Sequence, residues 1–362
     1  MKNRVAVCMP VYNAEAVISK SVESILTQTF EDFKFIITDD CSIDSTAKVI
    51  ESVRDPRIVF LRNQENLGTI TTRNNMLGYC LENDFEYMAI MDADDIAYPK
   101  RLEKQIRILD QDQAIAVCGS SMEIERTGGI WLAQRDPDQI KVECLFGNPI
   151  PTSSATIRLR FMRQFDLKWD KSFWPCADYH LWYFMLYIEK LRARNTGDVD
   201  MLYSYSPQGV SHGRGLLEQE LKDAKVKQLI FECFGFSAND EDAFSFTKVV
   251  LYRSHDPSHA AGFLKVARKI LEKNSDKIVD DRGLKRGISH RASTYLTRTR
   301  NIPSATRNQI QKTLVFKYCH IVTLLEAFLI KTKINFLDYY FPNLSRELVK
   351  MYFRLRPRII KF

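Results

Sequence analysis

Three carboxylates follow one apolar run of the chain. Asp92, Asp94 and Asp95 stand in the segment Met91-Asp92-Ala93-Asp94-Asp95, at the end of the run 87–91. In open α/β sheets, ligands bind beyond the carboxyl ends of the strands. Carboxylates without a nearby Cys or His suit a hard cation such as Mg²⁺ or Mn²⁺, which keeps water ligands and bridges to substrate phosphates. The alternative is a solvated acidic turn that caps a helix starting near Pro99.

A second acidic pair, Asp39 and Asp40, follows the apolar run 35–38. A turn capped by Ser42 or Asp44 accounts for residues 44–46, but it does not account for the pair. In a parallel sheet these acids would lie beside Asp92–Asp95, where paired carboxylates repel each other unless a cation compensates them. One of them could instead accept a hydrogen bond from the N–H group of a nucleotide base.

A third segment, Val7-Cys8-Met9-Pro10-Val11-Tyr12-Asn13, ends a strand-like run in a proline and an aromatic residue. Taken alone, this segment is typical of an ordinary junction between a strand and a loop. It gains meaning only from the two acidic segments that follow it.

The elements that must position these residues are predicted by hydrophobic periodicity. Short apolar runs alternate with helical patterns through the first 120 residues, which predicts an α/β layer with largely parallel strands. The expected strands are 5–9, 35–38, 58–61, 87–91 and 115–118, and the expected helices are 18–26, 44–54, 69–83 and 99–110. Residues 150–210 are mixed, with a helix expected at 178–190 and a strand at 199–205. Past about residue 213 helical periodicity dominates, as at Phe263, Val266, Ala267, Ile270 and Leu271.

The composition indicates a soluble globular protein, with 362 residues, 45% hydrophobic and 27% charged residues, and a mean hydropathy of −0.26. The most apolar stretch, 314–330, contains Lys317, His320 and Glu326, so it is too charged to span a membrane comfortably. No signal peptide is evident at the start of the sequence. The eight cysteines include no Cys-x-x-Cys pair, and we therefore expect reduced thiols and a cytoplasmic location.

The basic charge is concentrated near the end of the sequence. Residues 282–362 carry 17 Lys and Arg against 3 Asp and Glu, interleaved with aromatic residues. Three explanations are open: a nucleic-acid surface, an anionic membrane surface, or helices packed on the rest of the protein with a basic exterior. We find no recognisable nucleic-acid-binding module and expect no nucleic-acid partner. The membrane surface is the favoured explanation, and it would make the protein peripheral at the cytoplasmic face of a membrane.

In their order and spacing, the three segments resemble the family 2 glycosyltransferases of the GT-A fold. The resemblance continues through Ile25-Leu26-Thr27-Gln28-Thr29-Phe30, Asn66-Leu67-Gly68, Thr72-Arg73-Asn74 and Asp92 to Pro99, and it covers about residues 4–212. It implies an α/β GT-A domain, a Rossmann-like nucleotide-diphospho-sugar transferase with a mostly parallel central sheet, over residues 1–212. The remainder, 213–362, would be a mainly helical, basic C-terminal region.

The resemblance also implies where the donor binds. Asp40 is the favoured contact to the base, usually uracil; Arg73 would approach the diphosphate. Asp94 would ligate Mn²⁺ or Mg²⁺, and Asp92 would contact the ribose or a metal-bound water. The full set implied for the nucleotide sugar is Pro10, Val11, Tyr12, Asn13, Glu15, Asp39, Asp40, Arg73, Asp92 and Ala93.

Inversion at an anomeric carbon requires a carboxylate that deprotonates the acceptor hydroxyl group on the face opposite the leaving group. The resemblance implies Asp178 for this role, within Cys176-Ala177-Asp178-Tyr179-His180-Leu181-Trp182. Residues 148–154 are expected to line the acceptor side. The chain departs from the family at Ala177, where Glu is frequent, and at Ser206, where His is frequent. His212 is the candidate replacement for that histidine as a metal ligand.

The resemblance therefore implies an inverting, metal-dependent, single-addition transferase. It would move a sugar from a nucleotide-diphosphate donor, a UDP-sugar in the favoured case, to a glycan or lipid-linked glycan in cell-surface polysaccharide biosynthesis. One alternative is an inactive nucleotide-sugar-binding or scaffold protein. Another is a sugar nucleotidyltransferase, against which residues 10–15 count because they contain no Gly and no basic side chain.

Overall fold

A computed structural model describes residues 4–204 and 216–299, apart from 252 and 255, together with 302, 304–306 and 310. The strands are β1 (Val5–Val11), β2 (Phe33–Asp39), β3 (Ile58–Arg62), β4 (Tyr87–Ile90), β5 (Ile96–Ala97), β6 (Ile115–Ile124), β7 (Gly129–Trp131), β8 (Thr156–Arg158) and β9 (Arg192–Tyr203). The helices are α1 (Ile18–Leu26), α2 (Thr46–Ser52), α3 (Thr69–Glu82), α4 (Arg101–Gln111), α5 (Pro137–Phe146), α6 (Leu159–Gln164), α7 (Ala177–Tyr183), α8 (Leu216–Cys233), α9 (Asp240–Val250), α10 (His259–Lys273) and α11 (Asp281–Arg298).

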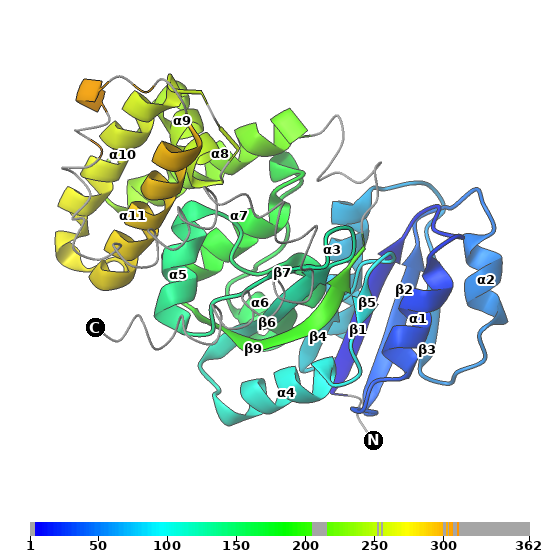
Figure 1. Ribbon diagram of the computed structural model, residues 1–362. Helices are drawn as coiled ribbons and strands as arrows, with labels where there is room; N and C mark the ends of the chain where they lie inside the picture. Colours follow the sequence, from blue (N-terminus) through cyan, green and yellow to red (C-terminus); the bar gives the residue numbers. More distant parts are fainter. Residues whose placement is uncertain are drawn as a thin grey trace, which may run out of the picture.

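One sheet runs through the N-terminal part of the protein, in the order β3-β2-β1-β4-β8-β6-β9-β5, with β7 paired to β6 (Figure 1). The pairs β1–β2, β1–β4, β2–β3 and β6–β9 are parallel. The short β8 is antiparallel to both β4 and β6, so β6 runs in the same direction as β4. The prediction of a mostly parallel sheet is confirmed. Its carboxyl edge therefore gathers the ends of β1, β2, β4 and β9.

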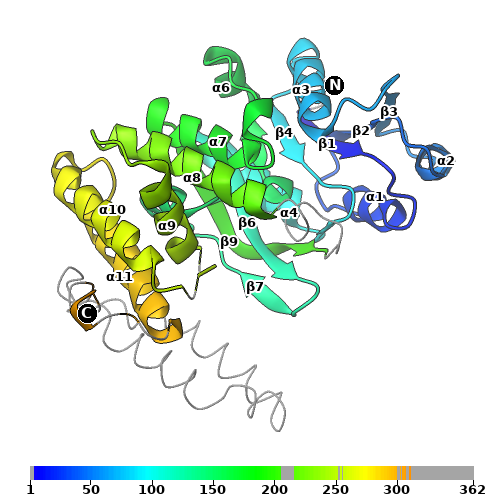
Figure 2. The same cartoon turned by 90° about the horizontal axis from the view of Figure 1, so that it is seen from above.

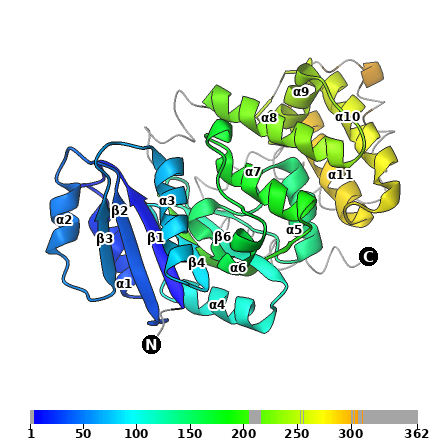
Figure 3. The same cartoon turned by 180° about the vertical axis from the view of Figure 1, so that it is seen from behind.

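Both faces of the sheet are buried. Along β1, Ala6 and Cys8 belong to one hydrophobic cluster, whereas Val5 and Val7 belong to the other. Helices α1, α2 and α4 contribute to the second cluster, and α3, α5, α6 and α7 to the first; Figures 1 and 3 view these two faces. Because each strand is covered on both sides, its sequence is a continuous apolar run rather than an alternating one.

Several predicted elements differ from those observed. The helix expected at 178–190 ends as α7 at Tyr183 and continues as a π-helical segment, η3 (Phe184–Ile188). The strand expected at 199–205 starts earlier, at Arg192. The prediction of Ser42 or Asp44 as N-cap was wrong. Ser45 holds that position, and Asp44 Oδ1 instead accepts a hydrogen bond from the Thr46 backbone N–H at 2.9 Å, closing a local turn.

Helices α8–α11 gather at one end of the molecule, away from α1 and α2 (Figures 1 and 2). The basic segment begins inside this packed region. In α11, the Arg291 guanidinium lies 4.0 Å from the Phe146 ring centre and pairs with Glu143 Oε2 at 2.7 Å, both on α5. Residues 282–298 thus fit the explanation of helices packed on the rest of the protein. Residues 311–362, which carry most of the remaining basic charge and the apolar stretch 314–330, lie outside the described residues.

Two further expectations concern cysteines and membrane helices. The seven cysteines of the described part of the chain are free thiols, as expected. No helix in residues 4–204 or 216–299 combines the length and apolar character needed to cross a membrane.

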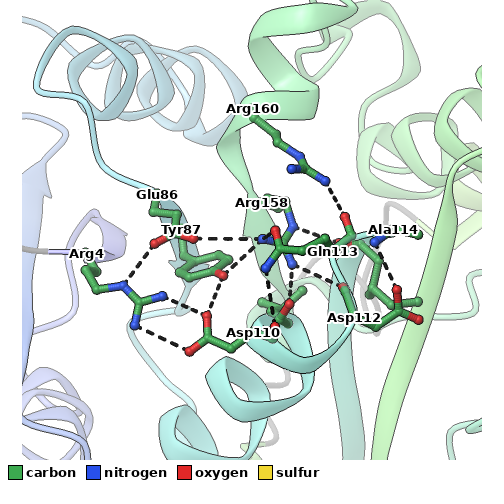
Figure 4. Close-up of polar contacts among 11 residues, drawn as sticks. Arg4, Glu86, Tyr87, Asp110, Asp112, Gln113, Ala114, Arg158 and Arg160 are labelled. Atoms are coloured by element: carbon green, nitrogen blue, oxygen red, sulfur yellow. Dashed lines mark hydrogen bonds and ion pairs between the residues drawn. The ribbon is translucent and has the colours of Figure 1, made fainter.

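The amino edge of the sheet is organised by one buried arginine (Figure 4). Arg158, 1% exposed, donates to the backbone oxygens of Leu109, Asp112 and Ile115. It also donates to Tyr87 Oη at 3.1 Å and to the Gln113 side chain at 2.9 Å. A single side chain therefore satisfies the carbonyl groups of the turn between α4 and β6, which a buried turn must otherwise leave unpaired.

We predict that Arg158→Met lowers the free energy of unfolding by about 3 kcal/mol, because it leaves several buried oxygens without donors. Arg160→Met is the matched control. The Arg160 side chain is exposed and donates only to the Gln113 oxygen among described residues, so its loss should cost no more than about 0.5 kcal/mol. Urea denaturation of the two variants measures the difference. Equal destabilisation would contradict the role given to Arg158.

Candidate active site

The loops after β1 and β2 are joined by hydrogen bonds between their side chains and backbones. The Asn13 backbone N–H donates to Ser42 Oγ at 2.9 Å, and Asn13 Oδ1 accepts from the Ile43 N–H at 3.0 Å. Glu15 Oε2 accepts from the Ser45 N–H at 2.8 Å. Asn13 and Glu15, both implied as nucleotide contacts, thus use their side chains to hold the two loops together.

The residues before Asn13 leave one open aromatic surface. Tyr12 is 48% exposed, whereas Val11 is buried and its carbonyl oxygen accepts from the Asp40 N–H at 2.8 Å. Pro10 is half-buried beside it. Of these three residues, Tyr12 is the one that presents a large side chain to a ligand.

Asp40 is buried and bound to the loop that leads into α3. Its Oδ1 accepts from Asn63 Nδ2 at 2.7 Å, from Thr72 Oγ1 at 2.9 Å and from the Leu67 N–H at 3.0 Å. Its Oδ2 accepts from the Gly68 N–H at 2.9 Å. Burial raises the pKa of this carboxyl, but the hydrogen bonds outweigh burial and hold the pKa below its usual range. Since a carboxylate oxygen has two lone pairs, Oδ2 keeps one for a further donor.

Asp39 is fully buried and has different partners. Its Oδ1 accepts from the Ser42 N–H at 3.1 Å, and its Oδ2 lies 3.1 Å from Nε of the half-exposed Arg62. No hydrogen bond from a described residue reaches Oδ2. The charge of Asp39 is therefore met by a surface cation, whereas Asp40 is met by neutral donors.

Arg73 of α3 reaches the acidic segment after β4. Its Nη2 lies 3.0 Å from Asp92 Oδ1, and its guanidinium lies 5.6 Å from the centre of the buried Trp169 ring. Arg73 itself is 5% exposed, and its Nε has no hydrogen-bond partner among the described residues. The contact to Asp92 was not expected from the sequence, which placed Arg73 on the diphosphate alone.

The other two carboxyl groups of the segment have little compensation for a negative charge, so their ionised forms are disfavoured. Burial and the neighbouring charge of Asp92 raise the pKa of Asp94, and the same causes raise the pKa of Asp95 to about 8. Asp95 Oδ1 accepts from the Ser204 N–H at 3.0 Å, while its buried Oδ2 has no hydrogen bond within the described part of the chain. Arg101, fully buried beneath the segment, donates to the Ile90 oxygen at 2.7 Å and is the nearby cation.

The carboxylates of Asp92, Asp94 and Asp95 fit a site for a divalent cation, of which the protein would supply only some of the ligands. Clustered hard oxygens with unmet negative charge attract such an ion. Within residues 4–204 and 216–299, no group of three His, Cys, Asp or Glu side chains converges as a complete metal site. The remaining ligands would have to be water and substrate oxygens. Ser206 and His212, the positions discussed for a histidine ligand, lie outside the described residues.

Asp178 lies in the first turn of α7 and is held from three directions. Its Oδ2 accepts from Asn148 Nδ2 at 2.7 Å and from Thr152 Oγ1, and its Oδ1 accepts from the Tyr179 N–H at 2.8 Å. Burial raises the pKa of Asp178, against the effect of these donors and of the positive charge of Arg73. Asp178 as a whole residue is half-buried, and its Oδ1 accepts only the Tyr179 hydrogen bond among the described residues. It can therefore take up a proton from a group that enters the site.

Helix α7 is itself fixed by polar contacts to α5 and to the loop that follows α5. Trp182 Nε1 donates to the Ile150 oxygen at 3.0 Å, and Tyr179 Oη donates to the Cys144 oxygen at 2.5 Å. Ala177, where the family often has Glu, is buried and belongs to the hydrophobic core. The position that departs from the family pattern is thus a packing position.

The structure brings most of the predicted site residues to one edge of the sheet. Arg73 pairs with Asp92 and acts electrostatically on Asp178. Ala93 is held through its carbonyl oxygen, which accepts from Ser21 Oγ at 2.7 Å. Sequence analysis placed residues 148–154 near the acceptor but missed that Asn148 and Thr152 bind Asp178. It also missed Trp169 and Arg101, because no local pattern distinguishes them from core residues.

A family model, Glycosyl transferase family 2, matches residues 6–186, which is half of the chain. An uncharacterized glycosyltransferase of Haemophilus influenzae is 34% identical over 192 residues, covering 49% of this chain and 58% of that protein. The UDP-Glc:alpha-D-GlcNAc-diphosphoundecaprenol beta-1,3-glucosyltransferase WfgD of Escherichia coli is 28% identical over 211 residues, covering 58% of this chain and 80% of the relative. The match therefore spans less than two thirds of the Haemophilus protein.

A solved structure extends the comparison to the fold. The crystal structure of S. aureus TarS 1–349 in complex with UDP aligns with a TM-score of 0.52 at 14% identity, over 86% of this chain and 89% of TarS 1–349. At this identity the likeness concerns the fold, which is of the GT-A type with a helical C-terminal part.

We predict that Asp40→Asn lowers the free energy of unfolding by about 2 kcal/mol at neutral pH, because the new amide faces the donors that bind the carboxylate. A lowered pKa stabilises the fold above the pKa of the unfolded chain. The difference between the two proteins should therefore shrink as pH falls below about 4. Asp39→Asn is the matched control, since its Oδ1 can still accept from Ser42. Thermal denaturation from pH 7 to pH 3 measures both, and an Asp39 effect as large as that of Asp40 would contradict this assignment.

Proposed function

The chain belongs to glycosyl transferase family 2, and on that premise we propose that it transfers a sugar from a nucleotide-diphosphate donor to a hydroxyl group of a glycan or lipid-linked glycan. We further propose that the donor is a UDP-sugar, that a divalent cation is required, and that the anomeric carbon is inverted. The catalytic unit in this proposal is residues 1–212, with 213–362 as the mainly helical remainder.

One observation carries the proposal. Arg73 forms an ion pair with Asp92, and its positive charge also acts on Asp178. Asp92 follows β4, which ends at the carboxyl edge, and Asp178 lies in the first turn of α7. An inverting transfer needs a base on the face of the sugar opposite the leaving group, and we assign Asp178 to that face and Asp92 to the side of the donor diphosphate.

In the proposed reaction, the acceptor oxygen forms a bond to the anomeric carbon while the bond from that carbon to the donor diphosphate breaks. The hydroxyl proton goes to Asp178, and the nucleoside diphosphate leaves with the electron pair of the broken bond. Asn148 and Thr152 hold Oδ2 of Asp178, and the Tyr179 N–H holds Oδ1. The base is therefore already oriented before the acceptor binds, which lowers the entropic cost of reaching the transition state.

On the donor side, the nucleotide base would lie against Tyr12. Asp40 Oδ2 would accept a hydrogen bond from the N–H group of the nucleotide base. This choice rests on the free lone pair of Oδ2, whereas Asp39 Oδ2 is already beside Arg62. Asp94, with Asp92, would hold Mn²⁺ or Mg²⁺. The cation, when bound, neutralises the diphosphate and so improves it as a leaving group.

For the acceptor, we extend to this chain the chemistry that names the Escherichia coli relative, whose acceptor is a diphosphoundecaprenol-linked sugar. A lipid-linked acceptor would bring the protein to an anionic membrane surface, and the basic charge of residues 300–362 supports this part of the proposal.

We predict that Asp178→Asn lowers the turnover of sugar by about 10²- to 10⁴-fold, the usual contribution of a general base. Donor binding should be retained, since Asp178 faces the acceptor. Turnover is measured by release of nucleoside diphosphate, and donor binding by calorimetry. Unchanged turnover in this variant would favour the alternative of an inactive nucleotide-sugar-binding protein.

We predict that kcat/KM falls on the acid side of neutrality as Asp178 becomes protonated. Because burial raises the pKa of Asp178, this loss should occur at higher pH than for an ordinary aspartate. Thr152→Val removes one donor to the carboxylate, so the acid limb should move to still higher pH. A Thr152→Ser variant keeps the donor and should leave the limb in place; a profile identical in Val and Ser variants would contradict the role of Thr152.

We predict that UDP, among UDP, GDP, dTDP, CDP and ADP, raises the thermal midpoint in Mn²⁺ and not in EDTA. A ligand at a hundredfold its Kd stabilises the native state by about 2.7 kcal/mol. A shift with another nucleotide would overturn the UDP assignment, and a shift of equal size in EDTA would overturn the metal requirement. No shift with any nucleotide would overturn the donor site.

A further inference from the structure

A cavity of about 310 Å³ lies at the amino edge of the sheet. It is lined by the starts of β6 and β9, the end of α4 and the residues before α5: Asp112, Ile115, Arg135, Asp136, Pro137, Arg192 and Arg194. Because β6 and β9 run parallel to β4, their first residues lie at the edge opposite Asp92 and Asp94. The cavity is thus separate from the proposed donor site.

Three arginines line this cavity. Arg192 and Arg194 alternate along β9 with the buried Ala193, so they project from the same face of the strand. Arg135 comes from the neighbouring segment. Its Cδ would lie 3.2 Å from a Cβ atom on Gly197, whose φ of +83° and missing side chain let the stem of Arg135 lie against β9.

Two acidic residues, Asp112 and Asp136, also line the cavity and offset part of the charge of its three arginines, but neither forms a strong pair with them. Asp136 Oδ1 accepts from two backbone N–H groups in the first turn of α5 and is used as the N-cap of that helix. Asp112 Oδ2 lies 3.4 Å from Arg192 Nη1, in a pair that is substantially exposed and therefore weak. Within the described part of the chain, no hydrogen bond or ion pair engages Arg135 or Arg194.

The walls of the cavity are rigid. The turn between α4 and β6, which carries Asp112 and Ile115, is held by Arg158 through the Asp112 and Ile115 carbonyl oxygens, as Figure 4 shows for Asp112. The segment before Arg135 is held to β9, because Asn195 Nδ2 donates to the Gln134 oxygen at 2.7 Å. The start of α5 adds the positive end of a helix dipole. An anion bound among these arginines would compensate the positive charge that the acidic residues leave.

We propose that Arg135, Arg192 and Arg194 form a second binding site for a phosphate or diphosphate group. Guanidinium groups bind phosphate oxygens through paired charge-assisted hydrogen bonds, and they do so better than lysines because of their planar geometry. The cavity is large enough for a diphosphate group with its hydration. The ligand is either a soluble phosphate compound or the head group of a phosphate-bearing lipid, and these share the chemistry that the site recognises.

The test is calorimetric titration of the full chain with pyrophosphate in EDTA, which removes the cation that the proposed donor site needs. The double variant Arg135→Gln/Arg194→Gln should bind pyrophosphate at least about tenfold more weakly, since each lost charge-assisted hydrogen bond costs about that factor. The double variant Lys48→Gln/Arg107→Gln removes the same charge from exposed positions of α2 and α4 and should bind as the wild type does. Arg73→Gln, which changes the proposed active site and does not line this cavity, should also bind as the wild type does.

Cosedimentation with phosphatidylglycerol vesicles, against phosphatidylcholine vesicles, separates the two sources of the phosphate. Binding of soluble pyrophosphate that the arginine double variant loses supports a soluble ligand. Vesicle binding that the same variant loses, without pyrophosphate binding, supports a lipid head group. Absence of both, or losses equal to those of the Lys48/Arg107 control, would overturn the site. Loss of pyrophosphate binding in Arg73→Gln alone would assign the anion to the donor side instead. All variants are first compared with the wild type by thermal denaturation, so that a folding defect is recognised.

Discussion

The accumulation of carboxylates at one edge of a parallel sheet is the constraint on which the rest of the site depends. Parallel strands end side by side, so the acids after β2 and β4 meet, and each must find compensation. Neutral donors of the loop before α3 meet Asp40, while Arg62 meets Asp39 and Arg73 meets Asp92. The carboxyl groups of Asp94 and Asp95 have raised pKa values. The buried Oδ2 of Asp95 has no hydrogen bond among the described residues. A divalent cation would compensate the negative charge of these carboxylates when they ionise. In the proposed function, the same cation would also bind the diphosphate group of the donor.

Arg73 interacts with both the proposed donor-binding carboxylate, Asp92, and the proposed catalytic base, Asp178. It lies buried against Trp169, where a flexible arginine loses its freedom and acts as a fixed charge. From there it pairs with Asp92 and lowers the pKa of Asp178 against the effect of burial. The neighbouring Asn74 makes two hydrogen bonds to the Trp169 backbone, so the segment that leads to α7 is tied to α3.

The C-terminal helices stabilise the element that carries the proposed base. On α8, the buried Lys227 pairs with Asp223 and lies 5.2 Å from the Tyr179 ring of α7, and burial lowers the pKa of Lys227 to about 7. The thiol of Cys176, the residue before α7, donates to the backbone oxygen of Gln219 on α8. Arg291 of α11 packs on α5, whose following loop supplies Asn148. The helical region is therefore continuous with the core of the catalytic part.

The sequence by itself determined most elements of the first 120 residues and the residues that stand at their ends, but not the short β8 that joins β4 to β6. Apolar runs predicted the strands of the first 120 residues, because burial on both faces leaves no polar position in a central strand. The acids at 39, 40, 92 and 94, and the Asp178 in the first turn of a helix, followed from the same local rules and from the family resemblance. The partners of these acids were decided by tertiary structure alone. Arg73 meets Asp92, and Asn148 and Thr152 meet Asp178, across 19 to 30 residues of chain. Such contacts depend on how helices pack on the sheet, and local periodicity carries no information about which side chains packing brings together.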